Sequence, residues 1–196
     1  MSALSEKDLS LLHTHLVVPI AVGDVVYGQD GLSPDMEYGL HEALSEIDPD
    51  SALLAIALSG KHIALQYSKN SPIAGALSIE CSKIIDDYGR DWLLNFNRGP
   101  LDEDSLIETL SHVPEDLESL ADLFDSFRST LSDDTQPISV LCKILSIQAR
   151  AHMEIADFIL TELEQVDKVS NIMERLDVPS TDVKNNVILF PVHLRH

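Results

Sequence analysis

The most regular pattern of apolar and polar positions lies between residues 113 and 131. Apolar side chains recur there at alternating intervals of four and three residues, at Val113, Leu117, Leu120, Phe124, Phe127 and Leu131. That spacing places them on one face of an α-helix, as in the seam of a coiled coil. The other face of this predicted helix is acidic and carries Glu115, Asp116, Glu118, Asp122 and Asp125.

Helix starts elsewhere are marked by a capping residue, which proline follows in two places. Ser5 begins a predicted helix to about residue 16, and the pairs Ser33-Pro34 and Ser71-Pro72 each begin another. Pro137 opens the longest predicted helix, whose apolar stripe continues to Leu176. About 40 residues of helix span roughly 60 Å, which exceeds the expected diameter of the domain. This helix is therefore predicted to be kinked, broken, or projecting from the body.

Two other stretches are less regular. Residues 52–67 fit a buried helix, which alanines favour, but Ser59-Gly60-Lys61 could also form the turn of a hairpin; the helix is the preferred interpretation. Valines and glycines near residues 16–27 predict extended segments, and residues 187–192 predict a short strand that pairs with them. The predicted fold is mainly α, an irregular bundle of about seven helices with this minor β element, in a single domain over residues 1–196.

Charge narrows the classes of partner. The chain carries 33 acidic and 13 basic residues, a formal net charge of -20. Residues 101–134 hold eleven acids and one base, Arg128, so half of the net charge lies there. Basic residues form no cluster, which excludes direct binding to a nucleic-acid backbone. The electrostatic field of this negative charge favours a protein partner with a basic or mixed surface.

Apolar runs and cysteines indicate where the protein resides. The longest apolar runs have seven residues, too few to cross a membrane, and no signal peptide is recognisable. Cys81 and Cys142 make no disulfide framework and are expected in the core. The expected location is the cytoplasm, without membrane insertion.

Two polar pairs could carry chemistry. Glu37 and His41 are four residues apart on a predicted helix and are the candidate metal ligands, although no Glu-x-x-His motif accompanies them. Gln148 and His152 lie within the apolar stripe of the longest helix, where buried polar groups must find hydrogen bonds. They predict either a lined pocket or a polar pair that sets the register in an oligomer; alternatively, both face water at the edge of the stripe.

No catalytic or phosphate-binding motif occurs, and no cofactor is expected. The leading hypothesis is a non-enzymatic protein that binds a protein partner, as an accessory or regulatory subunit, an inhibitor or an adaptor. The acidic residues from Glu115 to Asp125 are its candidate contact surface. The alternative is a helical enzyme or sensor with a pocket lined by Glu37, His41, Gln148 and His152. Self-association through the seam at 113–131 is a third possibility.

Overall fold

The described residues of the computed structural model form a helical bundle. They are residues 4–28, 31–69, 71–96, 103–133 and 135–175. The helices are α1 (Glu6–His15), α2 (Val17–Tyr27), α3 (Pro34–Ser45), α4 (Pro49–Tyr67), α5 (Pro72–Phe96), α6 (Glu103–Leu110), α7 (Val113–Arg128) and α8 (Pro137–Arg175). No strand occurs among these residues, so the prediction of a mainly α fold is confirmed.

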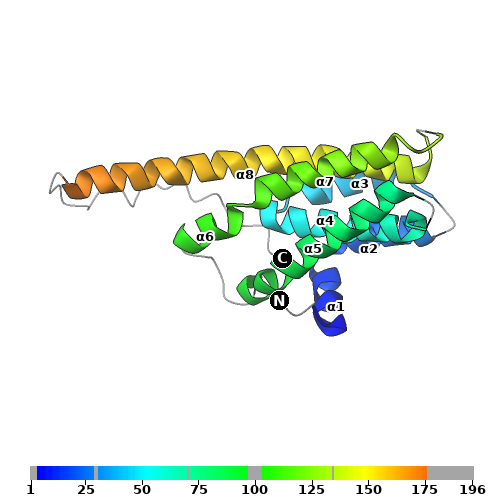
Figure 1. Ribbon diagram of the computed structural model, residues 1–196, viewed down its shortest axis with the longest axis horizontal. Coiled ribbons are helices and arrows are strands. Elements are labelled where there is room, and N and C mark those ends of the chain that lie inside the picture. Colours follow the sequence, from blue (N-terminus) through cyan, green and yellow to red (C-terminus); the bar gives the residue numbers. More distant parts are fainter. Residues whose placement is uncertain (1–3, 29–30, 70, 97–102, 134, 176–196) are drawn as a thin grey trace.

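Helix α4 forms the centre of the bundle. Every residue from Ser51 to Gly60 is buried, and α2, α5, α7 and α8 all pack against this helix (Figure 1). A helix satisfies its own backbone hydrogen bonds, so it can be buried on all sides without an unpaired polar group. The preferred helix at 52–67 is confirmed, and the hairpin alternative is wrong.

Small residues let the neighbouring helices approach α4 and α5 closely. A Cβ atom at Gly60 would lie 2.8 Å from both the Cys81 sulfur and Cζ of Phe124, which belong to α5 and α7. A Cβ atom at Gly89 on α5 would lie 2.7 Å from Leu4 and 2.9 Å from Leu12, beside α1. At each glycine, the neighbouring side chains therefore pack against the Hα atom that takes the place of a side chain.

The predicted β element near residues 16–27 is wrong, because Val17–Tyr27 is helix α2. Its valines at 18, 22, 25 and 26 recur at helical spacing and are buried. A valine costs a helix only about 0.5 kcal/mol of propensity, whereas burying its side chain contributes about 1.5 kcal/mol or more. The free energy gained by burial against α4 therefore outweighs the helix propensity cost of the valines, and Val17–Tyr27 is helical. The proposed pairing strand at 187–192 lies outside the described residues.

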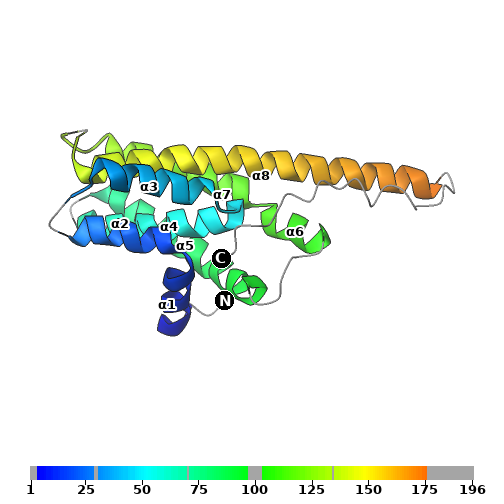
Figure 2. The ribbon, with the colours of Figure 1, turned by 180° about the vertical axis from the view of Figure 1, so that it is seen from behind.

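Helix α8 projects from the bundle. It is one helix of 39 residues, and the other helices cover only its first part, as Figure 2 shows from behind. Among residues 137–166, whose exposure the structure describes, the last fully buried one is Ala156. A helix this long is expected to be kinked, broken or projecting from the body, and in the structure it projects. The seam at 113–131 is buried as predicted from Val113 to Phe127, and α7 packs along α8.

The close approach at Gly60 can be tested by adding one methyl group. We expect Gly60→Ala to lower the free energy of unfolding by about 1–3 kcal/mol, because the rigid Phe124 ring must move. Gly39→Ala on α3, where nothing lies within 4 Å of the new atom, should raise that free energy by about 0.5–1 kcal/mol. Urea denaturation of both variants checks this; equal effects at the two positions would contradict the packing described.

Candidate functional site

The two predicted polar residues of α8 both reach α3. The side-chain nitrogen of Gln148 lies 3.1 Å from Nδ1 of His41 and donates to it. Nε2 of His152 lies 2.8 Å from the carbonyl oxygen of Leu44 and donates to it. Gln148 and His152 are both buried, so neither residue faces water, and their hydrogen bonds join α8 to α3 within the same chain.

His152 keeps one hydrogen-bonding atom without a partner. Its side chain is 1% exposed, and Nδ1 has no hydrogen-bond partner among the described residues. If that atom were protonated, a buried N–H group without an acceptor would result. Burial lowers the pKa of His152, while the Leu44 carbonyl and the more distant Asp48 oppose the shift. The imidazole is therefore neutral near pH 7 and joins α8 to the last turn of α3.

The candidate metal ligands do not form a metal centre with other residues. Glu37 is exposed, whereas His41 is half-buried against Gln148. Within the described parts of the chain, no three His, Cys, Asp or Glu side chains lie close enough together to hold a metal ion. The structure thus brings His41, Gln148 and His152 to one contact between α3 and α8 and leaves Glu37 in solvent.

One predicted acid of α7 is engaged with α5. Asp116 accepts a 2.6 Å hydrogen bond from the Tyr88 hydroxyl and lies 3.4 Å from the Lys83 ammonium nitrogen. Burial and this carboxylate raise the pKa of Tyr88, so the phenol remains a donor at any physiological pH. Asp116 thus stabilises the packing of α7 on α5 rather than presenting a free charge.

Two more of the predicted acids bind Arg150 of α8. The guanidinium group lies 2.9 Å from Asp122 and 2.8 Å from Asp125, and it also donates to the Ser146 hydroxyl at 2.6 Å. These bonds clamp α7 to α8 along the outside of the seam. Glu115 and Glu118 are exposed, and no ion pair with a described residue holds either of them. Of the five predicted acids, these two are the ones available to a partner.

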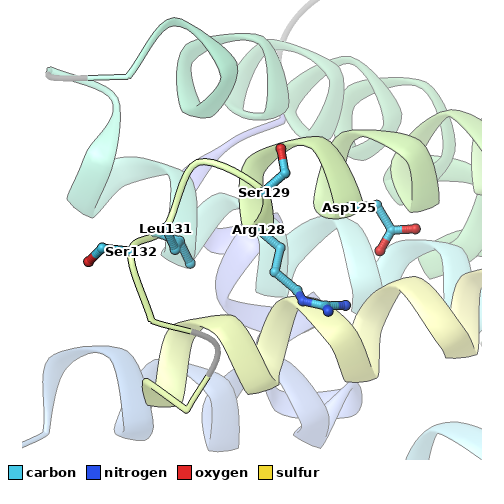
Figure 3. A pocket seen from close by; sticks show the side chains of 5 residues that line it. All are labelled: Asp125, Arg128, Ser129, Leu131 and Ser132. Atoms are coloured by element: carbon cyan, nitrogen blue, oxygen red, sulfur yellow. The ribbon is translucent and has the colours of Figure 1, made fainter.

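A polar cavity of about 580 Å³ lies at the end of α7, where the chain turns toward α8 (Figure 3). Its lining includes Asp125, Arg128, Ser129 and Ser132, with Leu131 as its apolar member. The end of a helix presents carbonyl oxygens, which disfavour an anion. Asp125 already binds Arg150, and the lining carries charges of both signs on Asp125 and Arg128, so charge alone selects no ligand for this cavity.

A histidine pair that the sequence pattern did not reveal joins α1 to α4. The ring centroids of His13 and His62 lie 5.2 Å apart, edge to face, and Tyr27 of α2 lies 5.7 Å from His62. Burial and the nearby Lys61 lower the pKa of both imidazoles. The two histidines are 49 positions apart in the sequence, so local spacing carries no signal of their contact.

The cysteines lie in the core, as predicted. Burial raises the pKa of Cys142 to about 12 and raises the pKa of Cys81 further. A thiol is nucleophilic only as its thiolate, so neither cysteine is suited to covalent catalysis.

Large apolar side chains of α8 are exposed to solvent. Ile147, Ile155 and Phe158 are 47%, 44% and 53% exposed. None of the helices within the described residues is by itself long and apolar enough to cross a membrane; α1 and α2 meet these criteria only together, as a pair bent by 99°.

Comparison with known proteins gives no identification. No protein-family model matches the chain, and no curated protein or solved structure is significantly similar to it. What the protein does has to be inferred from the chemistry of its own residues.

The buried imidazole of His152 predicts a pH dependence of stability. Because its pKa is lower in the folded protein, the unfolded chain binds the proton more readily. The free energy of unfolding should therefore be highest above pH 6.5, the approximate pKa of an unfolded-chain histidine, and should fall as the pH drops toward the folded pKa.

A substitution isolates the contribution of His152 to this pH dependence of the free energy of unfolding. In His152→Gln the amide can still donate to Leu44 but does not titrate, so urea denaturation from pH 7.5 to 5 should show a smaller decline than in the unmodified protein. His112→Gln, at an exposed position, is the matched control. Parallel curves for His152→Gln and the unmodified protein would show that His152 does not contribute.

Proposed function

We propose that this protein binds a protein partner and is not itself an enzyme, acting as an accessory or regulatory subunit, an inhibitor or an adaptor. The observation that carries the proposal is the projection of α8. This helix continues beyond the elements that cover it and exposes Ile155 and Phe158 (Figure 2). Exposed aromatic and aliphatic side chains on a rigid helix are typical of interaction surfaces.

Charge indicates the chemistry of the partner. The net charge of -20 and the free carboxylates of Glu115 and Glu118 favour a basic or mixed surface. Such a partner is attracted over a distance of about 8 Å at physiological salt, and the attraction weakens as salt is added.

The contacts of α3 and α8 favour this function over the pocket alternative. Gln148 donates to His41, and His152 donates to a backbone carbonyl, so these groups are used to join two helices. Glu37, the carboxylate of the alternative, is exposed on α3. A pocket enzyme would need these four groups directed at a common ligand, and the structure directs three of them at one another or at the backbone.

Native mass measurement of untagged protein, purified gently from its own host without chelator, tests the proposal. We expect a mass above 21.6 kDa at low salt, with the excess equal to a second polypeptide, and a return toward 21.6 kDa in about 0.5 M salt. A monomer that carries a metal or small molecule would contradict the proposal, as would a bare monomer under every condition.

Charge reversal tests the electrostatic part. Glu115→Lys with Glu118→Lys should weaken the complex by about tenfold and reduce its dependence on salt. Glu37→Lys with Glu42→Lys is the matched control, because these two exposed acids on α3 change the net charge equally. If both double variants weaken the complex alike, net charge alone is responsible and the α7 surface is not.

A further inference from the structure

Helix α3 covers α8 only along part of its length. His41 contacts Gln148, and Leu44 contacts His152, so the two helices lie side by side and run in the same direction. Helix α3 ends at Ser45, whereas α8 continues for 23 residues beyond His152, or about 35 Å. Among the described residues, α3 therefore does not extend along α8 beyond this point (Figure 2).

The apolar character of that side does not stop where α3 stops. Ile144, Gln148 and His152 are buried, the latter two in contact with α3, and the same helix side continues with Ile155 and Ile159. Exposure rises from 1% at His152 to 44% at Ile155 and 53% at the adjacent Phe158. We call Ile155, Phe158 and Ile159 the distal face of α8.

Acidic residues border the distal face. Glu154 beside this face and Glu162 one turn further along it are both exposed, and no lysine or arginine occurs from residue 151 to 167. The preceding basic residue, Arg150, is bound to Asp122 and Asp125. An apolar surface with carboxylates on its borders is complementary to an amphipathic helix whose apolar stripe is bordered by lysine or arginine.

We propose that the distal face binds a basic amphipathic helix of a protein partner, which lies along α8 as a continuation of α3. This inference rests on the proposed function and specifies the surface and the class of partner. A second copy of the chain fits less well, because its own distal face would bring Glu154 and Glu162 against the same acids.

A defined probe tests the proposal on the full chain. The probe is a fluorescein-labelled peptide of about 18 leucines and lysines, arranged so that leucine forms one helical stripe, or about five turns. In fluorescence anisotropy at low salt we expect saturable binding to the unmodified protein. The same peptide with glutamate in place of lysine should not bind.

Two substitutions locate the binding. Phe158→Asp should weaken binding of the lysine peptide by about tenfold or more, because it places a charge in the centre of the apolar contact. Ile79→Asp on α5 is the matched control, since Ile79 is 72% exposed and the change in charge is the same. Equal affinity for Phe158→Asp and the unmodified protein overturns the proposal, and so does an equal loss in both variants.

Sedimentation and hydrogen exchange distinguish a basic helix from two other occupants of the distal face, a second copy of the chain and another part of the same chain. A sedimentation mass of about twice 21.6 kDa that Phe158→Asp reduces to the monomer would assign the face to a second copy and overturn the proposal. Protection from hydrogen exchange in the isolated monomer that continues undiminished from Ala156 through residues 157–166 would show that the chain covers the face itself, which also overturns the proposal.

Native mass measurement separates this inference from the proposed function. If the complex isolated from the host persists unchanged with Phe158→Asp, the protein binds a partner but not through the distal face. If the unmodified protein forms no complex, the proposed function fails as well.

Discussion

Complete burial of α4 from Ser51 to Gly60 is the constraint on which the rest of the structure depends. A helix that is apolar around its circumference must be enclosed by other helices, and here α2, α5, α7 and α8 enclose it. The absence of a side chain at Gly60 sets how closely α5 and α7 approach, through Cys81 and Phe124. Remaining polar groups in this centre find partners: Ser59 donates to the Ala55 carbonyl, and Trp92 donates to Ser51.

Unequal helix lengths connect this core to the proposed function. Helix α4 has 19 residues and α8 has 39, so α4 cannot cover α8 over its whole length. The contacts of Arg150 and His152 fix the first part of α8 to α7 and α3. Beyond them α8 leaves the bundle and exposes Ile155 and Phe158, and a surface on a preformed helix loses little conformational entropy when a partner binds.

Much of the fold could be predicted because local patterns and burial agree. The 4-3 spacing from Val113 to Phe127 and the length of α8 are properties of the sequence itself. The valines of α2 misled the prediction, because β propensity is weak compared with burial against α4, which depends on the whole fold. The polar residues Gln148 and His152 were recognisable, but their partners His41 and Leu44 lie more than 100 positions away. The intramolecular use of Asp116, Asp122 and Asp125 depends likewise on distant basic or hydroxyl groups.

Hydrogen exchange along α8, with and without the leucine-lysine peptide, tests the central claim most directly. In the isolated protein, amides from Leu141 to Ala156 should exchange slowly, and protection should decline through residues 157–166. Adding the peptide should slow exchange over residues 151–166 and leave α2 and α5 unchanged. Protection that already extends evenly to residue 166, or a peptide effect confined to other helices, would contradict the account.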